Sequence, residues 1–109
     1  MKPCKSTWKQ RELQVNDFFG GKGRMPLSGK NSGHGSGDIR HDFLVVEHKH
    51  RIRHAVVSLW DKLSIEAKKE NKTPVVTLSV KGRPGFWVMC HSSDLLIAAN
   101  QRWKVTREL

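Results

Sequence analysis

Two carboxylates and a lysine near the middle of the chain have the types and spacing of a site for metal-assisted hydrolysis. Asp38 precedes an apolar stretch that contains Glu47 and Lys49. Residues two apart on a β-strand point to the same face, so Glu47 and Lys49 are expected to lie side by side. Carboxylate oxygens suit a hard divalent cation such as Mg2+. Such a cation can activate water and neutralise charge on a phosphate, and an adjacent lysine can stabilise the same charge.

The segments that carry these residues must pair for the carboxylates to meet. A two-residue turn at His41 and Asp42 would set Asp38 opposite Val45, on the same face as Glu47. The two acids would then be diagonal neighbours about 7–8 Å apart, close enough for both side chains to reach one cation. Asp42 would point to the opposite face, and we expect it to be a turn residue.

The first predicted helix places a third carboxylate on an apolar face. Glu12 lies within the stripe formed by Trp8, Val15 and Phe19. A carboxylate among apolar side chains is costly unless a partner compensates its charge. Glu12 is therefore a candidate to join the metal site from above the sheet. Asp17 lies on the same helix but off the stripe, and it is the weaker candidate.

The rest of the chain alternates helical and strand patterns. The predicted elements are a helix at 7–19, strands at 38–40 and 43–49, a helix at 54–70, strands at 74–80 and 86–91 joined by a turn at 82–85, and a helix at 93–101. This order predicts a small α/β domain, with a central mixed sheet flanked by helices. The 109 residues are enough for one domain, 1–109. Trp8, Trp60 and Trp87 fall on core-facing sides of these patterns, so packing is preferred over stacking on bases.

A glycine-rich basic segment at 20–37 separates the first helix from the candidate site. Its sequence, GGKGRMPLSGKNSGHGSG, cannot bury a core, and we expect a flexible loop. The cations Lys22, Arg24 and Lys30 suit close approach to a phosphate backbone, although a plain linker has the same composition. The glycines lack the GxxxxGK[ST] spacing of a phosphate-binding loop, so no nucleotide cofactor is expected.

The whole chain is strongly basic, with 20 Lys and Arg against 10 Asp and Glu and a formal net charge of +10. Such an excess favours nucleic acid, because each cation that pairs with a phosphate releases condensed counterions. Cys4 and Cys90 make neither a disulfide framework nor a zinc motif, and the six histidines lack zinc-site spacing. With no membrane-length apolar run and no apolar leader, a cytoplasmic protein without membrane association is expected.

The motifs around the candidate site resemble those of a known nuclease family. GDIRHDFLVVEHKHR is similar to the second and third motifs of PD-(D/E)XK nucleases. RMPLSG followed by GD resembles the R-x-P-x-S-G…GD pattern of archaeal-type and phage Holliday junction resolvases. The resemblance extends over about residues 8–91. It implies a restriction-endonuclease-like fold and a homodimer that makes paired cuts in four-way DNA junctions with Mg2+, or with Mn2+.

The resemblance also assigns roles to individual residues. The catalytic set is Glu12, Ser28, Asp38, Glu47 and Lys49, of which Glu12, Asp38 and Glu47 hold the metal ion. Arg24 and Ser28 match the loop positions that approach the scissile phosphate, and among the basic residues we predict that Lys22, Arg24, Lys30, Arg51 and Arg53 bind DNA. Two departures stand out. Gly37 replaces the usual proline before Asp38, and the short step from Asp38 to Glu47 requires the tight turn described above.

Two other interpretations stay open at this point. A repair or restriction-like nuclease would share the site without preferring junctions. A non-catalytic basic DNA-binding protein would share only the scaffold, because an E-x-K pair on a strand also arises by chance as a surface ion pair. The nuclease interpretations predict that Asp38→Asn and Glu47→Gln abolish cleavage while DNA binding survives.

Overall fold

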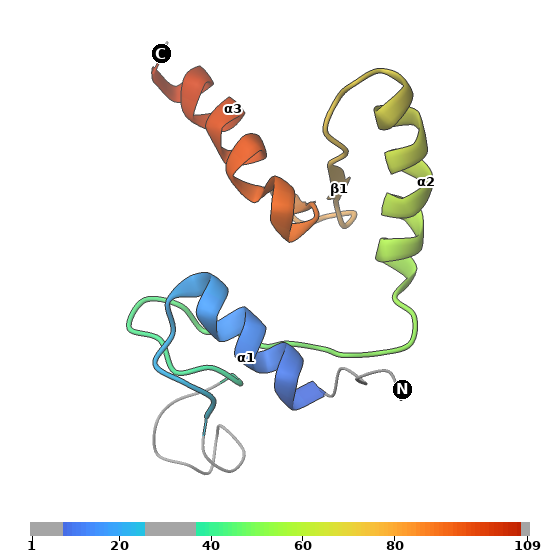
Figure 1. Ribbon diagram of the computed structural model, residues 1–109. Helices are drawn as coiled ribbons and strands as arrows, with labels where there is room; N and C mark the ends of the chain where they lie inside the picture. The colour runs from blue at the N-terminus through green and yellow to red at the C-terminus, as the bar shows by residue number, and fades with distance from the viewer. Residues whose placement is uncertain (1–7, 26–36, 108–109) are drawn as a thin grey trace. The chain divides into compact units, whose positions relative to one another are not determined.

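The computed structural model describes residues 8–25 and 37–107 of the chain. The elements in these residues are α1 (Trp8–Phe19), α2 (Ala55–Lys69), β1 (Val76–Leu78), β2 (Trp87–Met89), the 3-10 helix η2 (Ser92–Asp94) and α3 (Leu95–Arg107) (Figure 1). Helices and a small antiparallel sheet together make a small α/β fold, as the sequence predicts. The chain divides into two compact units, Met1–Ile52 and Arg53–Leu109.

In the first unit, α1 forms where the sequence predicts it, but the buried face of the helix is polar. Glu12 and Asn16, one turn apart, are its buried residues, whereas Trp8 of the predicted apolar stripe is exposed. The helix ends at Gly20, whose φ of 65° is a left-handed conformation that glycine adopts without steric penalty. The chain then turns back, and the Gly21 N–H donates to the Asn16 carbonyl oxygen at 2.8 Å. A returning main chain needs polar partners, and the polar face of α1 provides them.

Three short segments of the first unit pair through isolated bridges. Ile39 forms antiparallel bridges with Arg24 and with Val46, and at 1% exposure it is the most deeply buried large side chain among the described residues. The stretch 43–49, predicted as a central strand, contains no regular strand. Only Val46 pairs, and Phe43 is 89% exposed. A central strand needs neighbours on both edges, whereas within the described part of the chain this segment bridges to Ile39 alone.

In the second unit, α2 follows its predicted bounds closely and ends in a Schellman motif. Asn71 has a φ of 56°. Its N–H donates to the carbonyl oxygen of Lys68 at 3.2 Å, and the N–H of Lys72 donates to that of Ala67 at 2.9 Å. These bonds satisfy carbonyl groups that the helix end would otherwise leave without partners. Ala67, on the predicted apolar face, is buried, and Trp60 is partly buried.

β1 and β2 form the predicted hairpin. The paired residues are Val76 with Met89, Thr77 with Val88, and Leu78 with Trp87. Val76 is buried, and β1 contacts α2. Trp87, which the sequence pattern assigns to the core, is instead 46% exposed. Among the described residues, only the short strand β1 pairs with β2.

The last helix is longer than predicted. It begins after η2 and continues to Arg107 rather than ending near residue 101. The side chain of His91 caps η2, because its Nδ1 accepts the N–H of Ser93 at 3.2 Å. No residue of α3 is buried. Among the described residues, no helix has both the length and the apolar character that crossing a membrane requires.

Candidate functional site

The first unit brings Asp38 alongside the segment that carries Glu47. The Asp38 N–H donates to the carbonyl oxygen of Val46 at 2.7 Å. One carboxylate oxygen of Asp38 accepts the N–H of His48 at 2.6 Å. The main chain and the side chain of Asp38 therefore hold the two residues that flank Glu47 in sequence.

The pairing register differs from the predicted one by two residues. The predicted turn sets Ile39 opposite Leu44, whereas the observed bridge joins Ile39 to Val46. Next to this bridge, Asp38 contacts Val46 through its main chain and His48 through its side chain. Because successive side chains point to opposite faces, a shift of two residues leaves Asp38 and Glu47 on the same face, as predicted from their spacing. The connecting turn is accordingly two residues longer than predicted.

Gly37 allows the two segments to come together at this point. Its φ is 88°, and a Cβ at this position would lie 2.6 Å from the carbonyl oxygen of Val46. Proline is fixed near a φ of about −65° and cannot adopt this conformation. Glycine is therefore the residue that this geometry requires.

Glu47 and Lys49 form an ion pair on the surface of the first unit. The distance from Lys49 Nζ to Glu47 Oε2 is 3.0 Å, and both side chains are more than half exposed. The pair lies as expected for residues two apart in an extended segment. An accessible carboxylate and ammonium are required by the nuclease interpretation, and an exposed ion pair is also what the non-catalytic interpretation predicts.

Glu12 has the compensating partner that its buried position demands. Arg24 Nε donates to Glu12 Oε1 at 2.7 Å, and the glutamate side chain is only 10% exposed. The guanidinium of Arg24 also lies over the Trp8 ring, 5.1 Å from its centroid. Arg24 is thus held by two residues of α1 that are one turn apart. The pair fixes the start of the glycine-rich segment against the helix.

Asn16 is a structural residue that the sequence analysis missed. Its Oδ1 accepts the N–H of Gly23 at 2.7 Å, and its Nδ2 donates to Asp17 at 3.1 Å. The available signal was its position four residues after Glu12, on the same side of the helix. A second polar residue on a predicted buried stripe indicates that something polar covers that stripe.

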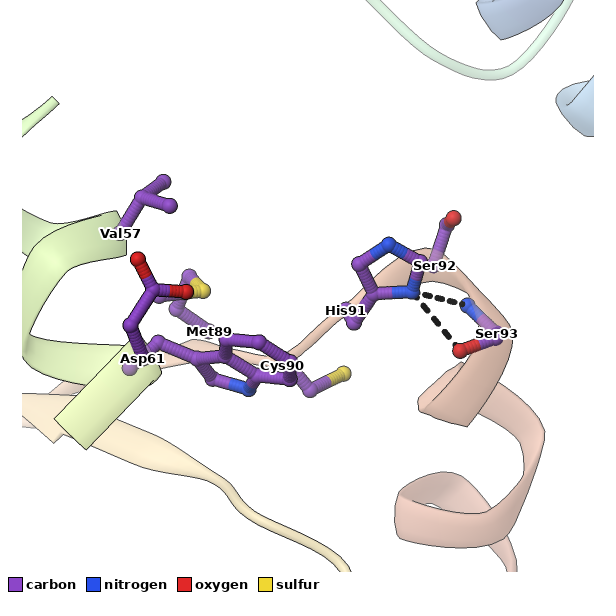
Figure 2. Close-up of a pocket in the computed structure, with 8 residues that line it drawn as sticks. Val57, Asp61, Met89, Cys90, His91, Ser92 and Ser93 are labelled. Atoms are coloured by element: carbon purple, nitrogen blue, oxygen red, sulfur yellow. Dashed lines mark hydrogen bonds between the residues drawn. The ribbon is translucent and has the colours of Figure 1, made fainter. Parts of the chain in front are cut away.

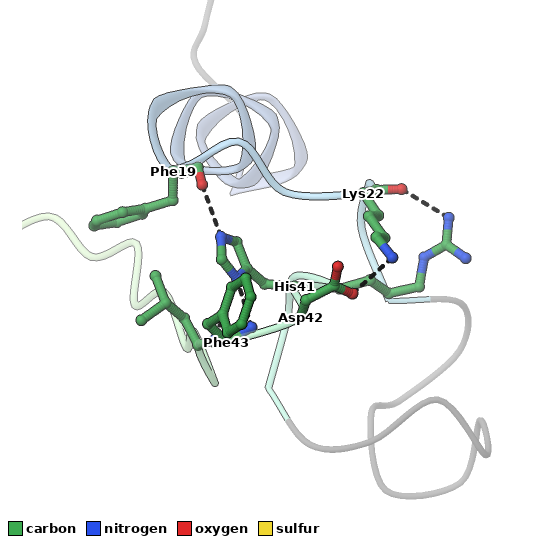
Figure 3. A network of polar contacts seen from close by, with 7 residues as sticks. Phe19, Lys22, His41, Asp42 and Phe43 are labelled. Carbon is green, nitrogen blue, oxygen red and sulfur yellow. Dashed lines mark hydrogen bonds and ion pairs between the residues drawn. The ribbon is translucent and has the colours of Figure 1, made fainter.

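A polar network joins the end of α1 to the turn after Arg40 (Figure 3). Lys22 Nζ lies 2.6 Å from Asp42 Oδ1, and this hydrogen bond and the ammonium charge lower the pKa of Asp42. His41 Nε2 lies 2.8 Å from the Phe19 carbonyl oxygen. The N–H of Phe43 donates to His41 Nδ1 at 3.0 Å. Asp42 is therefore a turn residue, as expected. His41 acts as a clamp, because its two ring nitrogens join the end of α1 to the main chain of the turn, and the sequence did not reveal this role.

The described cations assigned to DNA binding form two groups. Lys22 and Arg24, in the glycine-rich segment, form ion pairs with Asp42 and Glu12. Arg51 and Arg53 are exposed. Lys30 and the predicted catalytic Ser28 lie outside the described residues.

Two of the three carboxylates predicted to hold a cation lie on segments that contact each other. Asp38 and Glu47 come from facing segments, and their oxygens are the donors that Mg2+ and Mn2+ prefer. No group of three His, Cys, Asp or Glu side chains gathers within residues 8–25 and 37–107. Glu12 accepts from Arg24, so a role as third ligand requires the two partners to share this carboxylate.

A separate pocket of about 640 Å3 lies within the second unit. Asp61 of α2 and His91, which precedes η2, line it on different sides, together with Cys90 (Figure 2). His91 Nδ1 lies 2.7 Å from Ser93 Oγ, and its ring lies 5.8 Å from that of Trp60. These contacts hold the imidazole as a cap of η2. The pocket thus contains reactive residue types without a converging set of metal ligands.

Comparison of the chain with protein-family models, with curated proteins and with solved structures gives no significant match.

Proposed function

We propose that this protein is a metal-dependent, structure-selective DNA endonuclease that resolves four-way junctions. The observation that supports it most directly is the hold of Asp38 on both neighbours of Glu47. These hydrogen bonds hold the segment of Asp38 beside the segment that carries Glu47 and Lys49. A random surface E-x-K pair needs no upstream aspartate bonded across to it.

The proposed fold around this site is the restriction-endonuclease-like one, with the segments of Arg24, Ile39 and Val46 as the start of its central sheet. Ile39 bridges antiparallel both to Arg24 and to Val46, which supports this arrangement. Formation of the full sheet would pair the remaining edge of the stretch 43–49. It would also cover the exposed Phe43, because central strands are buried on both faces.

Asp38 and Glu47 would hold Mg2+, or Mn2+, with Glu12 as a third ligand if it is shared with Arg24. The bound cation would supply activation of water and neutralisation of charge at the scissile phosphate. The Lys49 ammonium, 3.0 Å from the Glu47 carboxylate, would bind a phosphate oxygen and stabilise the charge that develops there. The net charge of +10 favours binding of the polyanionic substrate.

The proposed active form is a cytoplasmic homodimer, because resolution of a junction requires paired cuts in two strands. Recognition by shape fits a basic chain that has no sequence-reading helix motif. The cations proposed to contact DNA are Lys22, Arg24, Lys30, Arg51 and Arg53.

The test is cleavage of a labelled synthetic four-way junction by the full chain, with a linear duplex of the same sequence as control. Mg2+-dependent cutting of the junction is expected, with none in chelator. Asp38→Asn should lower the rate by roughly a hundredfold or more, because loss of a metal ligand removes transition-state stabilisation. The new amide keeps an oxygen that can accept the His48 N–H, so the local fold should survive.

Asp42→Asn is the matched control, since it removes one nearby carboxylate that belongs to the turn. It should leave cleavage within about twofold of the parent protein, as surface substitutions usually do. Cutting of junction and duplex at equal rates would discard junction selectivity and keep the nuclease. Tight binding without cutting in any metal would establish the non-catalytic interpretation, which the exposed Glu47–Lys49 ion pair would then explain.

A further inference from the structure

The turn that joins β1 to β2 combines exposed aromatic and cationic side chains. The hairpin tip, residues 79–87, has no buried residue. Gly82 and Gly85 have φ values of 82° and 78°, and a Cβ at either position would meet no atom within 4 Å. The N–H of Arg83 donates to the Val80 carbonyl oxygen at 3.0 Å, which closes the turn. The tip is therefore a closed turn, and all of its residues are exposed.

Arg83 and Trp87 form a stacked pair in the hairpin tip. The guanidinium carbon lies 4.8 Å from the centroid of the indole ring. Stacking on an aromatic ring orients a guanidinium while its N–H groups stay available for an anion. Trp87 is 46% exposed and its neighbour Phe86 is 66% exposed. Large exposed aromatic side chains beside cations are typical of surfaces that stack on bases and bind phosphates.

No carboxylate balances the charge of the hairpin tip. The sequence from Asn71 to Ser93 contains no Asp or Glu, and Lys81 and Arg83 lie in the middle of this stretch. Within the described residues, neither Lys81 nor Arg83 forms an ion pair with a carboxylate. Both cations can therefore bind an external anion without breaking an internal salt bridge.

We propose that the hairpin tip binds unpaired nucleotides of a single-stranded nucleic acid. Trp87 and Phe86 stack on bases, and Lys81 and Arg83 bind the flanking phosphates. Duplex would use only the cations, because its base faces are already stacked on one another. Unpaired bases leave their faces open to the aromatic side chains. The inference concerns the second unit alone, and it does not depend on the proposed cleavage site in the first unit.

The test measures binding of the full chain to a fluorescently labelled oligothymidylate, by anisotropy, in chelator so that no cleavage interferes. Trp87→Leu keeps the charge and an apolar side chain but removes the stacking surface. We expect it to weaken single-strand binding roughly tenfold, the usual effect of losing one base–aromatic stack. Binding to a duplex of equal length should change less than twofold. A parallel series with oligouridylate distinguishes RNA from DNA as the source of the unpaired nucleotides, and the same loss in either series supports the proposal.

A second variant tests the phosphate contacts of Lys81 and Arg83, which are both exposed. Lys81→Gln with Arg83→Gln should make the slope of log affinity against log salt concentration shallower by about 1.4, because two fewer phosphates of the single strand are neutralised and fewer counterions are released. Lys62→Gln with Lys68→Gln on α2 removes the same charge elsewhere and is the matched control. Trp103→Leu on α3 is the matched aromatic control, since Trp103 is exposed and stacks with Arg107.

Circular dichroism verifies that each variant keeps its helices. The proposal is supported if both hairpin variants weaken single-strand binding and both controls do not. Equal effects of Trp87→Leu and Trp103→Leu would overturn it, since binding would then be a general property of exposed indoles. Equal effects of the two double variants would overturn the assigned phosphate contacts, because only net charge would matter.

Discussion

Arg24 and Glu12, from the loop and from α1, form a largely buried ion pair with 2.7 Å between Nε and Oε1. The pair joins the glycine-rich segment to the first helix, next to the Trp8 ring on which Arg24 stacks. It also explains why a carboxylate is tolerated on that face of α1. The same arginine is a proposed DNA contact, so its structural and functional roles need separate measurements.

Arg24→Met should destabilise the first unit by about 2 kcal/mol, because it leaves a buried carboxylate without its charged partner. Urea unfolding followed by circular dichroism measures the change. The control is Lys69→Met, which breaks the exposed pair with Glu66 and should cost less than about 1 kcal/mol. If the two variants lose equal stability, the Arg24 pair does not hold the loop to α1.

Gly21→Ala should destabilise the same region by about 1–3 kcal/mol through overpacking. Its Cβ would collide with Asn16 Oδ1 and would lie 2.6 Å from Ile39 Cγ2. Both neighbours are buried, so neither can move away freely. Thermal unfolding compares it with Gly82→Ala, which meets no atom and has only the penalty of a positive φ, about 1 kcal/mol. An unchanged midpoint for Gly21→Ala would contradict the observed packing.

The Lys22–Asp42 pair should make a small, acid-sensitive contribution to stability. The hydrogen bond and charge of Lys22 lower the pKa of Asp42 below its ordinary value of 3.8. A lowered pKa in the folded protein means that the contribution is present above the ordinary value. It is lost as the pH falls through the lowered one.

An NMR titration of the Asp42 carboxyl group measures this shift. Lys22→Ala should raise its pKa toward 3.8, and 1 M NaCl should have the same effect in part, because the pair is exposed and screened by salt. An unchanged titration in Lys22→Ala would show that the pair does not form in solution.

The imidazole of His41 should carry a proton on Nε2 and none on Nδ1. Its Nδ1 accepts main-chain N–H groups from Phe43 at 3.0 Å and Leu44 at 3.2 Å, and only an unprotonated nitrogen can accept. Nε2 faces the Phe19 carbonyl oxygen, which cannot donate. Nitrogen-15 NMR of the imidazole identifies the tautomer directly. A protonated Nδ1 at neutral pH would exclude the clamp.

Loss of the same clamp should be visible in hydrogen exchange. His41→Ala should speed exchange of the Phe43 and Leu44 amides roughly fivefold, as expected when one hydrogen bond worth about 1 kcal/mol is lost. The control is His50→Ala, because His50 is exposed and lies beyond the turn. Equal protection of the two amides in both variants would show that the turn is held by other contacts.

Local sequence signals were sufficient for most of the secondary structure. The 3.6-residue periodicity and the stop signals at Gly20 and Asn71 predicted α1 and α2, and the glycines at 82 and 85 predicted the hairpin turn. Such elements depend on main-chain conformation and on neighbours a few residues away. The end of α3 was predicted too early, because its weakly apolar final turns give little periodic signal.

The sequence by itself determined the basic character of the chain, the parity that relates Asp38 to Glu47, and the need of Glu12 for a partner. Only the tertiary structure decided which partner that is, and it decided the two-residue shift that bridges Ile39 to Val46 instead of Leu44. It also revealed the roles of Asn16 and His41. Alternation along a strand fixes which residues share a face, but it does not fix which residues pair. The pairing depends on the length of the turn and on the close approach of Gly37 to the Val46 carbonyl oxygen. Ion pairs between distant residues likewise have no periodic signature, so they emerge only once the segments have packed.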